Sequence, residues 1–159
     1  MGDSGESEIL AMSLAVYEER VSRLIVNVRD GRASPHKICM LLAVLDLARG
    51  GGLTENRIRF APPLLDRYTR FFKAVRGPGD HPNPYFPFFH LAGKLRGGAP
   101  SFWHLHPLPG REAALDALVT ARGTSDIIGN VACATLDTEL FELLQSAPAI
   151  EALGETISQ

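Results

Sequence analysis

Residues 34–50 read SPHKICMLLAVLDLARG, a stretch that begins with helix-start residues, ends at a glycine and is apolar on nearly every side between them. Ser34 is a favoured helix N-cap, Pro35 suits the first turn, and Gly50 is a common helix stop. A helix without a polar face must be covered by other elements. The stretch therefore predicts a central, buried helix around which the rest of the chain is organised.

Amphipathic patterns flank this central helix. Apolar residues at spacings of three and four predict a first helix over residues 10–28, which ends at Asp30-Gly31. Pro62-Pro63 opens a third helix whose apolar stripe reaches Val75. The opposite face of this third helix is basic, with Arg67, Arg70, Lys73 and Arg76.

Short extended segments are expected in the middle of the chain. Alternating residues predict a short strand at residues 57–60, and residues 86–92 and 101–107 predict a hairpin around the basic, glycine-rich tip at 93–98. The dense prolines and glycines of residues 77–84 argue against a helix there, so the aromatic run that follows is expected in a loop or strand.

The C-terminal part predicts further helices and one more strand. A fourth helix follows Gly110 and stops at Gly123, and residues 131–136 predict a strand. Asp137 caps the next helix, and Pro148 begins the last one. The apolar residues expected inside the fourth helix are Ala114, Leu115, Leu118 and Val119. The fold class is thus a mainly helical α+β domain over residues 1–159, winged-helix-like, with a small antiparallel sheet or hairpin.

Composition places the chain among ordinary globular proteins. It has 159 residues with 45% apolar content, which suffices for one core. No apolar run approaches the roughly 18 to 20 residues that cross a bilayer, and the N-terminus is acidic where a secretion signal is basic. Cys39 and Cys133 lie in apolar surroundings, as small core residues do. We expect a cytoplasmic protein without a membrane partner.

Charge is segregated along the chain. Residues 20–96 carry fourteen Lys or Arg against five Asp or Glu, an excess of nine positive charges. Residues 1–19 carry five acids and no Lys or Arg, and residues 97–159 carry eight acids against Arg111 and Arg122. Such segregation is typical of a surface that faces a polyanion, although charges scattered over all sides would give the same count.

The start of the central helix is the best candidate anion site. Unpaired amides at a helix start carry partial positive charge, and His36 and Lys37 lie in the first turn with Arg32 just upstream. A phosphate would find several donors there. The alternative is that Ser34 and Pro35 form only a well-made helix start and that Lys37 is solvated.

Catalytic and metal-binding patterns are weak. His104 and His106 lie two apart on one face of the expected strand, but no further ligands complete a zinc site. Cys39 lies in an apolar helix, where a thiolate is disfavoured, and no Gly-x-Ser-x-Gly turn or phosphate-cradling glycine loop is present. We therefore expect no metal, no cofactor, no catalytic residue and no enzymatic activity in this chain.

Several segments in order resemble one known family. These are residues 34–47, Asn56-Arg57-Ile58, His81-Pro82 with residues 86–91, Phe102-Trp103 and residues 136–141. Over about residues 8–157 the chain resembles the sulfur-binding domain of McrA-like, phosphorothioate-dependent restriction endonucleases. The resemblance implies binding to double-stranded DNA in which one phosphate oxygen has been replaced by sulfur.

The resemblance also implies roles for residues. The family's aromatic-Pro-Phe motif falls on Phe86, Pro87 and Phe88, with the proline ring forming the apolar cavity for sulfur. His90 lies where the family has a small residue facing that cavity. Phe86 replaces a Tyr common in the family. The family's Arg and Pro-His-Lys elements, which contact the flanking backbone and bases, map onto Arg32 and onto Pro35, His36 and Lys37, and a further Arg of the pocket falls on Arg122 or Arg111. The expected DNA contacts are Arg32, Ser34, His36, Lys37, Lys94, Arg96 and Arg122.

Physical chemistry agrees with this assignment. Sulfur is larger and softer than oxygen and a poorer hydrogen-bond acceptor, so an apolar wall favours it, whereas an oxygen pressed there loses water without compensation. Proline in a central strand removes a ladder hydrogen bond, so Pro87 is expected at an edge or bulge that a ligand can approach. Core filling beneath the hairpin is the alternative for Phe88 and Phe89.

Two other function classes stay open. Family members carry a metal-dependent HNH nuclease module after this domain, and no trace of it is found here, so we expect recognition without cleavage. A winged-helix-like transcription regulator would share the helices and the basic middle but prefer ordinary sequence-specific DNA. A small metal-dependent hydrolase would require stoichiometric metal at the histidines.

Overall fold

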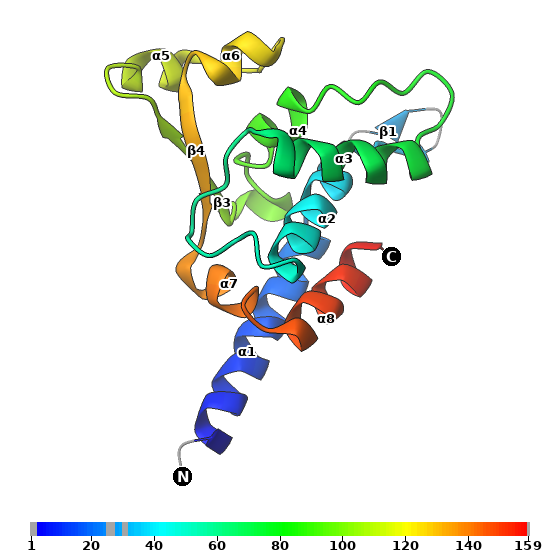
Figure 1. Ribbon diagram of the computed structural model, residues 1–159, viewed down its shortest axis with the longest axis vertical. Helices are drawn as coiled ribbons and strands as arrows, with labels where there is room; N and C mark the ends of the chain where they lie inside the picture. Colours follow the sequence, from blue (N-terminus) through cyan, green and yellow to red (C-terminus); the bar gives the residue numbers. More distant parts are fainter. Residues whose placement is uncertain (1–2, 25–27, 30–31, 159) are drawn as a thin grey trace.

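The computed structural model describes residues 3–24, 28–29 and 32–158. The fold is mainly helical with small antiparallel sheets, as the sequence predicts (Figure 1). No helix within these ranges is both long and apolar enough to cross a membrane. In chain order the elements are α1 (Asp3–Ser22), β1 (Val28–Arg29), β2 (Arg32–Ala33), α2 (His36–Arg49), α3 (Pro62–Val75), α4 (Tyr85–His90), the 3-10 turn η1 (Arg96–Gly98), β3 (Trp103–Pro107), α5 (Glu112–Ala117), α6 (Thr124–Ile128), β4 (Val131–Leu136), α7 (Thr138–Leu143) and α8 (Ala147–Ser158).

The central helix is α2, and its burial is confirmed. Helices α3, α4 and α8 all pack against it, and in Figure 1 it runs through the middle of the molecule. Its start differs by one position from the prediction, because Pro35 rather than Ser34 is the N-cap. The Ser34 hydroxyl bonds to the His36 ring and not to a helix amide. Seven α2 residues are buried: Cys39, Met40, Leu41, Ala43, Val44, Leu45 and Leu47.

The third predicted helix, α3, is also confirmed. It begins at Pro62, and Leu64, Tyr68 and Phe72 bury one stripe against α2. Val75, expected on the same stripe, is exposed in the last turn. Proline is tolerated in the first turn of a helix because its missing N–H has no partner there anyway.

The aromatic run is a helix, so the predicted hairpin over 86–92 and 101–107 is wrong. Tyr85–His90 forms α4, with Pro84 as its N-cap. Pro87 falls in the first turn, where an absent N–H costs no intrahelical bond, and the preceding prolines therefore start this helix rather than prevent it. Its burial in a helix also corrects the expectation that Pro87 lies at a strand edge.

The true partner of β3 is β4. They pair antiparallel from Trp103 opposite Leu136, with an irregularity between His106 and Pro107. The β4 strand matches the predicted one, whereas the strand expected at residues 57–60 is reduced to one bridge, between Ile58 and Ala134. Longer pairing is absent there among the described residues.

The first helix begins and ends earlier than predicted, at Asp3 and Ser22 rather than at residues 10 and 28. It ends at Ser22, and Val28 belongs to β1, which pairs with β2. The predicted end at Asp30-Gly31 lies outside the described residues. Hydrogen bonds from the amides of Arg23 and Leu24 to carbonyls three residues back tighten the turn after α1.

The region after Gly110 also differs from the prediction. The expected fourth helix is only α5, Glu112–Ala117, and a separate short helix, α6, follows it. Val119, expected to face inward, is 88% exposed. Its apolar side chain favoured a helix that continues to Gly123, but α5 ends at Ala117.

The helix after β4 starts where predicted, with Asp137 as its N-cap residue, but the Asp137 carboxylate makes no capping bond. Instead it accepts the Tyr17 hydroxyl at 2.8 Å, Arg20 Nη1 at 2.9 Å and His104 Nε2 at 2.6 Å. Asp137 therefore ties α1 to the end of the β3–β4 sheet. The last helix, α8, begins one residue before Pro148.

Candidate functional site

The start of α2 is organised around one histidine. His36 Nε2 lies 2.6 Å from the His81 carbonyl oxygen, and His36 Nδ1 lies 2.6 Å from Ser34 Oγ. A carbonyl only accepts hydrogen bonds, so Nε2 carries the proton and, in the neutral ring, Nδ1 accepts the Ser34 hydroxyl. The ring also packs against Phe72, with centroids 5.0 Å apart. His36 is thus held in one orientation from three sides.

Helix α4 presents two rings beside this histidine. Phe86 and His90 lie one turn apart, with ring centroids separated by 4.3 Å, and Phe86 lies 6.1 Å from the His36 ring. His90 Nε2 is 2.9 Å from Thr120 Oγ1, which fixes the ring from the other side. Two segments that are about fifty residues apart in sequence therefore meet at half-buried rings.

A lysine lies close to this ring pair. Burial, and then the positive charge of Lys37, lower the pKa of His90 below its ordinary value of 6.5. Burial also lowers the pKa of Lys37. Near neutral pH the His90 imidazole is therefore uncharged, and the cluster combines an apolar, neutral wall with an adjacent ammonium group. We call Ser34, His36, Lys37, Phe86 and His90 the ring cluster.

Two of the predicted pocket residues face inward. Phe88 is 0% exposed and packs edge-on against Trp103 at 5.5 Å and against Phe60 at 5.1 Å. Pro87 is buried as well. The core-filling alternative thus applies to Phe88, and Pro87 is buried in the first turn of α4 rather than at an open strand edge.

The predicted cations differ in how they are used. Arg96 is tied to the end of α1, because its Nη2 donates to the Ser22 carbonyl at 2.7 Å and its amide to the Arg23 carbonyl at 2.9 Å. Lys94 is exposed between α4 and η1. The backbone of Arg32 pairs with Arg29 in the β1–β2 hairpin, and its side chain lies outside the described residues.

Of the two further arginines, Arg122 is the better placed. Arg111 donates from Nε and Nη2 to Asn130 Oδ1 at 3.0 and 2.9 Å, so this edge of its guanidinium group is used inside the protein. Arg122 is exposed and follows Thr120, the partner of His90, by two residues. Arg122 is therefore the arginine whose chain position brings it near the ring cluster.

Part of the positive charge of residues 20–96 is neutralised by ion pairs within the chain. Asp46 of α2 accepts Arg67 Nε at 3.0 Å, Arg70 Nη2 at 3.0 Å and Arg49 Nη1 at 3.3 Å. Two of the four basic residues expected on one face of α3, Arg67 and Arg70, are thus paired with one carboxylate. A count of charges along the sequence overstates the positive surface for this reason.

The predicted metal candidates pair with other groups. His104 bonds to Asp137, and His106 Nε2 lies 2.8 Å from Thr135 Oγ1. No group of three or more His, Cys, Asp or Glu able to hold a metal occurs among the described residues. Cys39 and Cys133 are buried free thiols, and burial raises the pKa of Cys39 to about 11, so its thiolate is scarce at neutral pH.

Sequence reasoning missed two members of this environment. Thr120 reaches His90 across thirty residues, and the His81 backbone carbonyl reaches His36 across forty-five. Neither contact has a local signal, because a lone threonine or a carbonyl looks the same in any loop. Comparison with known proteins adds no identification: no protein-family model matches the chain, and no curated protein matches it significantly.

Proposed function

We propose that this chain binds phosphorothioate-modified double-stranded DNA, with the ring cluster as the contact to the sulfur-bearing linkage. The observation that carries the proposal is the juxtaposition of the Phe86 and His90 rings, 4.3 Å apart, with Lys37 at the start of α2. An apolar wall next to a cation suits an anion that has one soft, weakly hydrated atom. Recognition without cleavage remains the expected activity.

The neutral state of His90 supports a preference for sulfur. An uncharged ring offers contact surface but little electrostatic attraction for an oxygen anion, whereas sulfur gains dispersion contact there. An ordinary phosphate oxygen pressed against the rings would lose water without a partner, at a cost of about 1 to 3 kcal/mol. That cost corresponds to roughly ten- to hundredfold in affinity.

The cations near the rings contribute affinity rather than choice. Lys37, Lys94 and Arg122 would approach phosphates on either duplex equally, because phosphate contacts position a protein without distinguishing linkages. The positions of Ser34 and His36 at the helix start add partial positive charge from unpaired amides. Salt should therefore weaken binding to both duplexes in parallel.

Pro87 has a different role in this proposal from the one implied by the family resemblance. Because Pro87 is buried whereas Phe86 and His90 are half-buried, the sulfur would touch those two rings rather than the proline. The proposal therefore ranks Phe86→Ala above Pro87→Ala in its effect on discrimination.

A direct titration tests the proposal. Fluorescence anisotropy would compare a labelled duplex with one stereodefined phosphorothioate, in each configuration, against its all-oxygen twin at a stated salt concentration. We expect roughly ten- to hundredfold tighter binding to one thio duplex, reduced toward equality in Phe86→Ala. Phe141→Ala, a half-buried ring on α7, is the matched control and should retain the preference.

A second pair of variants tests the contribution of the Lys37 charge to binding. Lys37→Gln should weaken both duplexes by a similar factor, whereas Lys73→Gln on the exposed side of α3 should change neither strongly. Equal affinity of the unaltered protein for thio and oxygen duplexes in both configurations would refute the proposal. Sequence-specific binding to plain DNA would instead favour the transcription-regulator alternative.

A further inference from the structure

The segment between α2 and α3 is fastened to β4 on both sides of Arg57. The Asn56 side chain donates to the Leu136 carbonyl at 2.7 Å and accepts the Leu136 amide at 2.8 Å. Ile58 and Ala134 exchange two backbone hydrogen bonds, of 2.7 and 2.8 Å. The backbone around Arg57 and Arg59 is therefore fixed, unlike an ordinary surface loop.

This attachment directs two arginines to the same side. Ile58 is fully buried, and in an extended segment its neighbours point the opposite way, so Arg57 and Arg59 are both exposed, with Cα atoms about 6.6 Å apart. Neither guanidinium has an ion-pair partner within the part of the chain that the structure describes. They differ in this from Arg67 and Arg70, which share Asp46.

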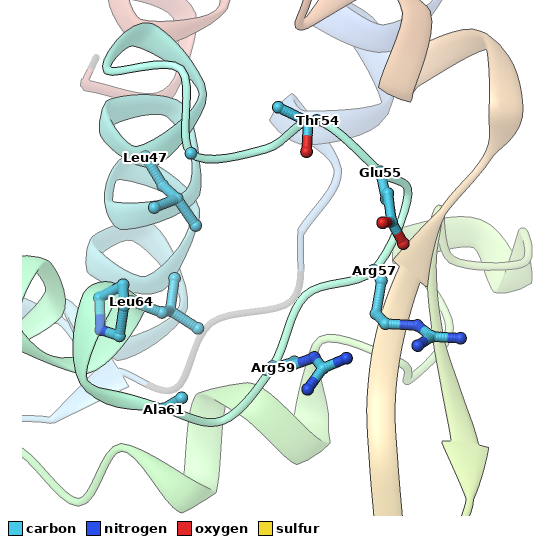
Figure 2. A pocket seen from close by; sticks show the side chains of 9 residues that line it. Leu47, Thr54, Glu55, Arg57, Arg59, Ala61 and Leu64 are labelled. Carbon is cyan, nitrogen blue, oxygen red and sulfur yellow. The ribbon is translucent and has the colours of Figure 1, made fainter.

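The two arginines border a hollow with an apolar wall. Its volume is about 240 Å³, and Leu47 of α2 and Leu64 of α3 line the side opposite Arg57 and Arg59 (Figure 2). Thr54 and Glu55 complete the rim. A second hollow, of about 460 Å³, shares both arginines and reaches His106 and Thr135 of the β3–β4 sheet.

The close approach of the chain to this wall depends on a glycine. A Cβ at Gly52 would lie 2.6 Å from Leu47 Cδ1, so a side chain there would push Leu47 from its place. Gly52 itself lines the hollow. The chain at Gly52 thus packs closely against Leu47, with no room for a side chain between them.

We propose that Arg57 and Arg59, with this hollow, form a binding site for a nucleotide. The phosphate would bind to the guanidinium groups, which match phosphate oxygens in geometry and charge. The base or sugar would lie against Ala61 and Pro63, the apolar lining residues that remain accessible, since Leu47 and Leu64 are only 9% and 1% exposed. Glu55 and Thr54 would accept hydrogen bonds from hydroxyl or amino groups. The nucleotide is either free in solution or one unit of a single-stranded nucleic acid.

This site is separate from the ring cluster. Leu47 lies eleven residues along α2 from His36, which corresponds to roughly 16 Å of helix. The inference does not rest on phosphorothioate recognition, and each site can be disabled alone.

Amide chemical-shift titrations of the whole chain test the site. The probes are inorganic phosphate, adenosine 5′-monophosphate and a short all-oxygen single-stranded oligonucleotide. We expect shifts concentrated at residues 54–59, with the nucleotide bound more tightly than phosphate. Tighter binding of the oligonucleotide than of the nucleotide would identify nucleic acid as the source, and the reverse would identify the free compound.

Single substitutions distinguish binding at Arg57 and Arg59 from nonspecific attraction of an anion to a basic surface. Arg57→Gln and Arg59→Gln should each weaken nucleotide binding roughly tenfold, whereas Arg76→Gln, an exposed arginine at the end of α3, removes the same charge and should leave it unchanged. Ala61→Leu, which fills the hollow, should weaken the nucleotide but not inorganic phosphate.

Three results would overturn the site: no shifts at residues 54–59, a nucleotide that binds no tighter than phosphate, or an equal loss in Arg76→Gln. Unchanged spectra elsewhere in each variant establish that the fold is intact. The thio preference should persist in Arg57→Gln and disappear in Phe86→Ala, so failure of one proposal is distinguishable from failure of the other.

Discussion

Helix α4 has only six residues, yet its two faces lie in different environments, one in the core and one at the surface. One face carries Phe88, which is fully buried against Trp103 and Phe60 and whose carbonyl accepts Trp103 Nε1 at 2.9 Å. The other carries Phe86 and His90, which are half-buried and pack against each other with their ring planes tilted by 39°. A short helix can therefore be anchored in the core through one face, by packing and by the Trp103 hydrogen bond, while its other face forms a surface site.

The largest difference between the two faces should be in stability. Phe88→Ala removes a fully packed ring and should lower the free energy of unfolding by about 3 to 5 kcal/mol. Phe86→Ala should cost less than about half of that, because its ring is already partly in water. Urea denaturation followed by circular dichroism measures both. A smaller loss for Phe88→Ala than for Phe86→Ala would contradict the assignment of faces.

A smaller effect is expected from the hydroxyl that holds His90. Thr120→Val leaves His90 Nε2 without its partner and should lower the free energy of unfolding by about 1 kcal/mol. Thr69→Val is the matched control, since its hydroxyl bonds only to the Leu65 carbonyl within α3. Equal changes in the two variants would mean that the His90 contact is not specific.

Pro87→Ala sharpens the comparison between faces further. It should lower the free energy of unfolding by about 0.4 to 1 kcal/mol through the greater freedom of the unfolded chain. The thio preference should narrow less than in Phe86→Ala, because Pro87 is buried whereas the Phe86 ring is half-buried. Pro148→Ala, in the first turn of α8, is the control for the backbone effect. A larger loss of preference in Pro87→Ala than in Phe86→Ala would restore the proline as the sulfur contact.

The smallest expected effect is a pH dependence. The pKa of His90 is lower in the folded chain than its ordinary 6.5. As pH falls below 6.5, the imidazole is therefore protonated more in the unfolded chain than in the folded chain. Stability should therefore decrease as pH falls from about 6.5 to the lowered pKa and then level off. His90→Gln should reduce this decrease, and His106→Gln should not. Thermal unfolding at a series of pH values checks the difference.

The sequence predicted those parts of the fold that have strong local patterns. The apolar run of α2, the Pro62 start of α3 and the β4 strand all follow from periodicity and helix-start chemistry. Helix α4 was misread because proline density was taken to exclude helix, whereas Pro84 and Pro87 occupy positions where proline is tolerated. Whether these prolines permit a helix depends on their positions in its first turn, which the amino-acid composition does not give.

The candidate site was predictable only in part. Ser34, His36, Lys37, Phe86 and His90 were all chosen from the sequence, but their meeting depends on the packing of α4 against α2. Thr120 and the neutralisation of Arg67 and Arg70 by Asp46 involve partners far apart in sequence. Local patterns do not encode such long-range contacts, so the charge count does not reveal which arginines are paired with a carboxylate.

The edge-on contact between Trp103 and Phe88 has a practical consequence. Trp103 is the one tryptophan of the chain, and it is fixed directly beneath α4 by its indole hydrogen bond. Its intrinsic emission therefore arises from a single known location under the ring cluster. Any ligand that displaces α4 changes that emission, which gives the protein a label-free optical reporter of its own.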